Sequence, residues 1–182
     1  MEMGGRCSLP ERARIFVVDK SGASVSADRP GSRRFATMAQ IESKHDVRRI
    51  AAEINVAPTV LVDLMAGGLD TVLGGCIDFL GGPHAAHGQP CAASFLMCLS
   101  CPCARATPAH LPVIVAVHDR LQDKANQMTP LRWAQRFAGP VAQLTDVLNR
   151  YPTTAVEDAR AQISPEQRDL VERFLRRSLD VR

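Results

Sequence analysis

The sequence predicts an all-α, multi-helix domain with a Cys-rich loop at its centre. Apolar residues recur at steps of three and four through most of residues 45–182, which is the spacing of an amphipathic helix. Helix start and stop signals flank these stretches. Aromatic residues make up only 4% of the chain, so the core must consist mainly of Leu, Val, Ile and Ala. With 182 residues, the chain is long enough for one domain with a core of its own.

Residues 1–44 differ from the rest and are rich in Ser, Gly and Arg. A short apolar run at residues 15–18 precedes a turn signal at residues 19–22 and a weak strand signal at residues 23–27. A hairpin of two strands is marginally stable on its own. We therefore expect a flexible N-terminal arm that forms a weak hairpin at most.

Two short helices are predicted at residues 46–54 and 58–66. Pro58 suits a first helical position, Gly67 with Gly68 suits a helix end, and Asn55 between the helices tolerates a left-handed backbone. The apolar residues fit the packing of a helix-turn-helix. They are Ile50, Ala51, Ile54, Val56, Leu61 and Leu64.

This helix pair is a weak candidate for DNA binding. The outward positions of its second helix include Thr59 but no Arg, Lys, Gln or Asn, the side chains that read base edges best. Phosphate contacts would come from Lys44, Arg48 and Arg49. We favour a structural helix pair and keep DNA contact as the less favoured alternative.

The remaining elements follow from further periodic stretches. An apolar stripe from Leu69 to Leu80 predicts a helix that contains Cys76, and residues 81–90 read as a loop. Helices are expected from Pro112 and from Thr129-Pro130, the second interrupted at Gly139-Pro140. Capping boxes at residues 154–157 and 164–167 predict the starts of the last two helices.

Five cysteines between residues 76 and 103 indicate a metal site. Residues 1–10 contain no signal-peptide stretch, so we expect a reducing cytosol, where clustered thiols bind metal rather than form disulfides. Cys98 and Cys101 have the Cys-x2-Cys spacing that clamps one ion. The preferred ligand set within a loop at residues 76–112 is Cys76, Cys91, Cys98 and Cys101. Cys103, His84, His87 and His110 are reserve ligands.

Zinc is the expected metal, in a closed structural site. Four thiolates satisfy its tetrahedral coordination, and no His-Glu-x-x-His or comparable pattern supplies the general base of a catalytic zinc. An iron–sulfur cluster takes the same four thiolates and is the alternative cofactor. Buried, unconnected cysteines acting as small hydrophobes are a further alternative, which applies most to Cys76 in its apolar stripe.

Composition and motifs exclude several classes of function. The net charge of +3 is well short of that of a chain that coats nucleic acid. The sequence has no phosphate-binding Gly-rich loop with its Lys, no membrane-spanning window and no nucleophile placed with a His–Asp pair. We therefore expect no enzyme, no small-molecule substrate and no membrane partner.

The stretch from Gly88 to Pro112 resembles a motif at the C-terminal end of uncharacterised actinobacterial proteins. These are similar to partners of tyrosine-recombinase integrases on mobile elements. The resemblance extends from about Asp46 to Arg182 and includes residues 76–79 and 129–133. The family pattern has Asn in place of Cys103, which argues against this residue as a primary ligand. Family members are longer and differ upstream of residue 45, which would fit a truncated relic or a misread start.

The resemblance implies a non-enzymatic, zinc-binding accessory protein of DNA integration. It would act in the cytoplasm and bind an integrase or recombinase as protein partner, or bind DNA. Two alternatives remain. One is a redox- or metal-responsive regulator in which oxidation of Cys103 beside Cys101 releases the metal. The other is a remnant without present activity.

Overall fold

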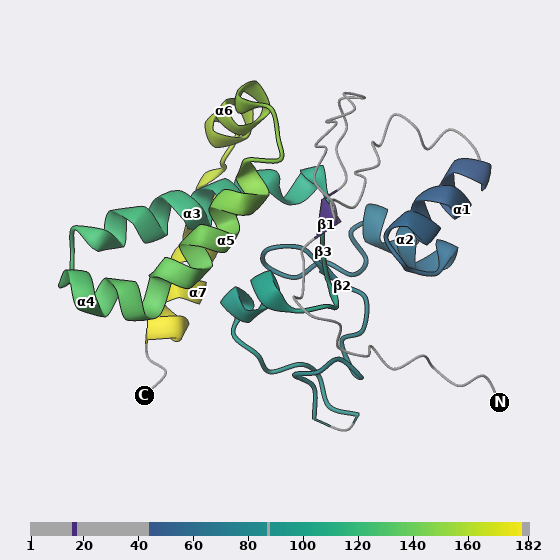
Figure 1. Cartoon of the computed structure of the whole chain (residues 1–182), viewed down its shortest axis with the longest axis horizontal. Coiled ribbons are helices and arrows are strands. Elements are labelled where there is room, and N and C mark those ends of the chain that lie inside the picture. The colour runs from purple at the N-terminus through teal and green to yellow at the C-terminus, as the bar shows by residue number, and fades with distance from the viewer. Residues whose placement is uncertain (1–15, 18–43, 87, 180–182) are drawn as a thin grey trace, which may run out of the picture.

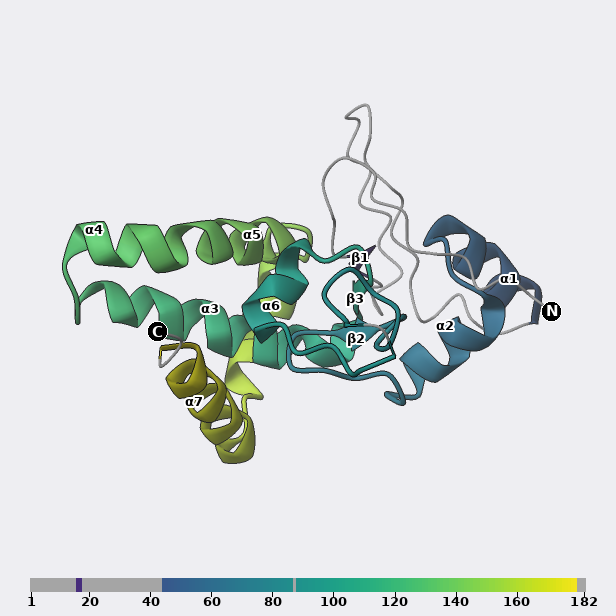
Figure 2. The same ribbon diagram turned by 90° about the horizontal axis from the view of Figure 1, so that it is seen from below.

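A computed structural model describes residues 16–17, 44–86 and 88–179 of the chain, and Figures 1 and 2 show its arrangement. The described part is mostly helical, as the sequence predicts. The α-helices are α1 (Lys44–Glu53), α2 (Pro58–Met65), α3 (Leu111–Ala125), α4 (Pro130–Trp133), α5 (Gly139–Leu148), α6 (Thr153–Ala161) and α7 (Pro165–Leu179). The shorter helical elements are the 3-10 helices η2 (Phe95–Ser100) and η3 (Pro108–His110) and the π-helix η4 (Ala134–Ala138).

A small sheet, which the all-α prediction lacks, lies between the helices. Its strands are β1 (Phe16–Val17), β2 (Gly75–Cys76) and β3 (Ala104–Ala106), in the order β1-β3-β2. β1 runs parallel to β3, and β2 runs antiparallel to it with Cys76 opposite Ala104. Of the predicted N-terminal arm, only β1 and Lys44 belong to the described residues, and the expected partner strand at residues 23–27 lies outside them.

The predicted helix over residues 69–80 is wrong. The backbone N–H of Thr71 donates to the Gly74 carbonyl oxygen at 2.6 Å, and the resulting tight turn leads into β2. A Cβ atom on Gly74 would lie 2.6 Å from the Arg105 carbonyl oxygen, and one on Gly75 would lie 2.2 Å from Leu64 Cδ1. The two glycines therefore permit a close approach that side chains would block. They also disfavour a helix, since Gly has a low helix propensity.

The α1–α2 pair has the predicted structure. Both helices end in a left-handed residue, Asn55 with φ of 56° and Gly67 with φ of 79°. In each case the following residue donates back across the helix end: Val56 N–H to the Ala51 oxygen, and Gly68 N–H to the Asp63 oxygen, both at 2.9 Å. The pair has a small apolar core of its own, separate from the main core. Its buried members are Ile50, Ala51, Ile54, Leu61 and Leu64.

The main core is organised around α3. This helix contacts α5, α6 and α7, and Figure 2 shows it between the α4–α5 layer and α7. Its apolar residues are buried on several faces because it has neighbours on more than one side. They are Leu111, Val113, Ile114, Val115, Val117 and Leu121. The 3-10 helix η2 adds Phe95 and Leu99 to the same core, which attaches the Cys-rich region to the helices.

The helical path from α4 to α5 does not break at Gly139-Pro140. Instead, the π-helix η4 directly precedes α5 (Figure 1). Pro140 lacks an N–H and would crowd the carbonyl four residues before it, and a π-helical turn widens the backbone at that point. The predicted interruption is therefore a local change of helix type.

One of the two predicted capping boxes is confirmed. Gln167 N–H donates to Ser164 Oγ at 3.2 Å, and Ser164 N–H donates to Gln167 Oε1 at 2.9 Å. The box at residues 154–157 is wrong, because α6 already begins at Thr153 and is preceded by Pro152. None of the helices in the described residues has the length and apolarity needed to cross a bilayer.

Asn55 provides a test of the helix pair. Replacing Asn55 with Val should lower the free energy of unfolding by about 1–2 kcal/mol, because a β-branched side chain is strained at positive φ. Asn55→Gly should leave it unchanged within about 0.5 kcal/mol. Urea unfolding followed by circular dichroism measures both. Equal stability of the Val and Gly variants would contradict the left-handed geometry.

Candidate functional site

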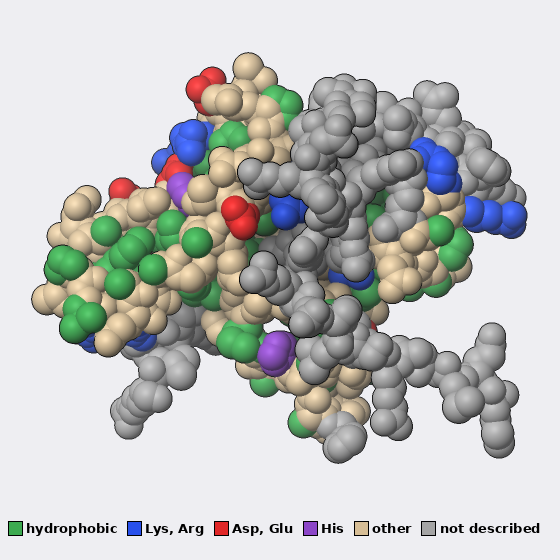
Figure 3. Space-filling view, viewed as in Figure 1, with side chains coloured by type: hydrophobic (Ala, Val, Ile, Leu, Met, Phe, Trp, Pro, Cys, Tyr) green, Lys and Arg blue, Asp and Glu red, His purple; other side chains and the backbone are tan. Residues whose placement is uncertain are grey.

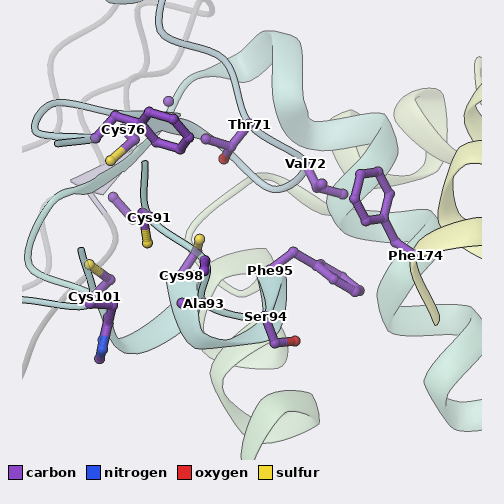
Figure 4. A pocket seen from close by; sticks show the side chains of 15 residues that line it. Thr71, Val72, Cys76, Cys91, Ala93, Ser94, Phe95, Cys98, Cys101 and Phe174 are labelled. Carbon is purple, nitrogen blue, oxygen red and sulfur yellow. The ribbon is translucent and has the colours of Figure 1, made fainter. Parts of the chain in front are cut away.

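Four cysteines from separate segments line one cavity of about 360 Å³. They are Cys76 of β2, Cys91 of the following loop, Cys98 of η2 and Cys101 just after η2. Figure 4 shows their sulfur atoms grouped at one end of this cavity. These are the four residues that the sequence singles out as the preferred ligand set.

Backbone hydrogen bonds position each of these cysteines. The N–H of Cys101 donates to the Cys98 oxygen at 3.1 Å, so the two residues flank a tight turn. The N–H of Cys91 donates to the Phe79 oxygen at 3.0 Å, which ties the long loop back on itself. Cys76 enters through the antiparallel pairing of β2 with β3. Strand pairing and loop closure therefore bring thiols from distant parts of the sequence to the wall of one cavity.

The thiols in the cavity influence one another. Burial and, to a smaller extent, the neighbouring thiols of Cys101, Cys76 and Cys91 together raise the pKa of Cys98 to about 11. The pKa of Cys76 is also raised, first by burial and then by Cys101 and Cys91, although the backbone N–H of Asp78 opposes this shift. A nearby cation would reverse the repulsion that these thiolates exert on each other. None of the described cysteines belongs to a disulfide bond.

The donors fit a thiolate-bound metal in kind, but they do not form a finished coordination shell. No group of three or more His, Cys, Asp or Glu side chains within residues 44–86 and 88–179 is arranged as a ready metal site. The sulfurs border a shared space, and an ion would have to draw them together. The chemistry of the donor set therefore supports a metal more strongly than the present geometry does.

The reserve ligands occupy different places. His84 is exposed and lines the same cavity as the four cysteines. Cys103 is not among the lining residues: it is 1% exposed, and its sulfur faces Gly82. The Ile77 N–H donates to the Cys103 carbonyl oxygen at 3.0 Å, so Cys103 lies against the segment that follows β2. His87 lies outside the described residues.

His110 is a structural residue. Its Nδ1 accepts the backbone N–H of Thr107 at 3.0 Å, and its Nε2 lies 3.0 Å from Asp70 Oδ1. In the neutral ring, Nε2 therefore carries the hydrogen and donates it to Asp70. Because both ring nitrogens are engaged, His110 joins η3 to the turn after α2 instead of facing the cavity. Only the Thr107-x-x-His110 spacing, which resembles a capping box, signals part of this network in the sequence.

Arg105 of β3 is a buried charged residue that no sequence pattern points to. Its guanidinium donates to the carbonyl oxygens of Pro102 at 2.7 Å and Ala104 at 2.8 Å, and reaches the Ile54 oxygen at 3.4 Å. It thus connects the turn after Cys101 with the end of α1. The sequence contains no signal for this role, because the partners are backbone oxygens, and the one on α1's side, that of Ile54, is 51 residues away along the chain.

The DNA-binding candidates lie away from the cavity, on the α1–α2 pair. Arg48 and Arg49 of α1 and Thr59 of α2 are exposed, and none of them lines the cavity. Lys44 begins α1, but its side chain is outside the described part of the structure. Figure 3 shows basic side chains at the end of the molecule that α1 forms.

No known family model, no curated protein and no solved structure matches this chain.

The raised pKa of Cys98 predicts a specific pH dependence of its reactivity. The thiolate is the nucleophile, so iodoacetamide alkylation of Cys98 in chelator-treated protein should increase roughly tenfold per pH unit from pH ~8 to ~10. It should level off only near pH 11. In urea the alkylation rate of the same residue should level off near pH ~8.5–9. Peptide mass spectrometry measures the rates, and identical profiles in both states would contradict the buried position.

Proposed function

We propose that this protein is a non-enzymatic, zinc-binding accessory protein of DNA integration that acts in the cytoplasm and binds a protein partner. The observation that carries the metal part is the convergence of Cys76, Cys91, Cys98 and Cys101 on one cavity. The integration context rests on the resemblance of residues 46–182 to partners of integrases.

Four thiolates suit zinc better than two would. They complete its tetrahedral shell, and their combined negative charge exceeds the positive charge of the ion. The Asp78 N–H that points at the Cys76 sulfur stabilises a thiolate there. When bound, zinc would supply a crosslink between β2, the loop and η2, with no open position needed for chemistry.

The loop before η2 explains why a crosslink would matter. Among the described residues between Ile77 and Ser94, only Gly82 is buried. This segment has no apolar core of its own, so side-chain burial contributes little to its ordering. The free energy of metal binding would then stabilise the folded form of this segment.

The exposed face of α2 supports a protein partner over DNA. Val62 is 53% exposed beside the exposed Asp63, and neither side chain reads a base edge or attracts phosphate. An exposed apolar residue on α2 and exposed arginines on the contacting helix α1 suit an interface that combines apolar and basic parts. DNA contact through the two arginines is the alternative that the experiment below distinguishes.

The redox alternative receives less support from the geometry. It depends on Cys103 reacting beside Cys101, yet Cys103 is 1% exposed and turned toward Gly82. Oxidants reach exposed thiolates first. Any oxidation-driven metal release would therefore start at the cavity cysteines.

Metal analysis tests the central proposal. Protein purified without added metal should contain about one zinc per chain, and Cys98→Ser should lower this at least fivefold. Chelation should lower the melting temperature by several degrees, since the metal binds only the folded site. Cys103→Ser is the matched control and should retain the zinc.

The opposite results are equally clear. A chain with no metal, or a Cys103→Ser variant that loses zinc as fully as Cys98→Ser, would contradict the ligand set. Bound iron, together with visible absorption and labile sulfide, would show that the cofactor is an iron–sulfur cluster and not zinc.

Binding assays test the partner. The probes are a purified tyrosine-recombinase integrase and a mixed-sequence DNA duplex of 30 base pairs. Val62→Glu should weaken recombinase binding at least tenfold by calorimetry. The control Leu131→Glu, which alters a side chain that is 70% exposed on α4, should not. Duplex binding with a steep salt dependence that Arg48→Ala reduces would instead favour the DNA alternative.

A further inference from the structure

The cavity that contains the four sulfurs is larger than a metal ion requires. A four-coordinate zinc ion lies about 2.3 Å from each sulfur, so it would fill only the end where they gather. The cavity measures about 360 Å³, within the range of roughly 300–1,000 Å³ that is typical of small-molecule sites. Figure 4 shows Val72, Phe95 and Phe174 at the other end, away from the sulfurs.

The second end of the cavity is apolar and aromatic. Val72 is 9% exposed and Phe95 is 7% exposed, and Phe174 reaches in from α7. The Phe95 and Phe174 ring centroids are 5.6 Å apart and the ring planes are tilted by 57°. A tilted pair presents the face of one ring and the edge of the other, which is the arrangement that a third aromatic ring packs against well.

The polar groups of the wall restrict the charge of a ligand. No Asp, Glu, Lys or Arg is among the described residues that line the cavity. The Thr71 hydroxyl already donates to the Gly74 oxygen at 2.5 Å. Apart from the exposed His84, no described lining side chain can carry a positive charge, so an anionic ligand would lose most of its hydration for at most one partner of opposite charge, which is unfavourable. Phosphates, carboxylates and nucleotides are therefore poor candidates.

We propose that this cavity binds a compact, uncharged aromatic molecule against Phe95 and Phe174, beside the cysteine sulfurs. The apolar walls provide the driving force, and the ring pair selects an aromatic over an aliphatic ligand. The ligand site shares the cavity of the proposed metal centre, but its two aromatic rings lie on η2 and α7, outside the loop that the metal would order.

Indole and benzoate are suitable probes for the full chain as purified. Both are single compact aromatic molecules, and benzoate adds a negative charge. Saturation-transfer NMR and titration should give an indole dissociation constant on the order of 1 mM or tighter. Benzoate should bind at least tenfold more weakly. No transfer to indole, or equal affinity for benzoate, would overturn the proposal.

Three variants locate the binding. Ala93→Leu places a branched side chain in the cavity and should weaken indole binding at least tenfold. Ala142→Leu, on the exposed side of α5, is the matched control and should bind indole normally. Phe174→Leu preserves an apolar wall without the ring and should weaken binding severalfold. Unchanged indole affinity in Ala93→Leu or in Phe174→Leu would overturn the assignment.

Repeating the titration after chelation separates this inference from the metal proposal. Indole binding that persists in chelated or naturally metal-free protein supports the aromatic site by itself. Zinc that is present in protein unable to bind indole overturns the aromatic site and leaves the metal proposal standing.

Discussion

The close approach of β2 to β3 is the constraint on which the rest of this structure depends. Gly74 and Gly75 lack the side chains that would collide with the Arg105 carbonyl and with Leu64. Because these two positions carry no side chain, Cys76 pairs opposite Ala104. The close contact of Gly75 with Leu64 also brings α2 against the sheet. Two hydrophobic clusters that share no buried residue are thereby joined. Arg105 and the Asp70–His110 hydrogen bond strengthen this junction with polar contacts.

The candidate site combines a rigid side with a weakly packed side. Cys98 belongs to η2, which inserts Phe95 and Leu99 into the core around α3. Cys91 belongs to an exposed loop that a few backbone hydrogen bonds connect to the rest. This division suits a ligand-dependent segment on a stable scaffold, since local unfolding begins where few apolar contacts exist. It also accounts for a cavity that combines thiols with aromatic rings.

Local signals explain which helices the sequence analysis identifies. Asn55, Gly67 and the Ser164–Gln167 pair act through hydrogen bonds a few residues away, so their effect is visible in a short window. The stripe from Leu69 to Leu80 misleads because burial in a compact turn can imitate helical spacing over a short stretch. The pairs Gly67-Gly68 and Gly74-Gly75 are the sequence features that contradict a helix there.

The sequence by itself determined the helix pair and the main helices of the C-terminal half, and it singled out the four cysteines that line one cavity. These follow from periodicity, end signals and residue chemistry, which operate over a few positions. Only the tertiary structure decided that Cys103 faces away from the cavity, that His110 is engaged with Thr107 and Asp70, and that Phe95 and Phe174 complete the cavity wall. These outcomes depend on strand pairing and helix packing between distant segments, and no local pattern encodes such contacts.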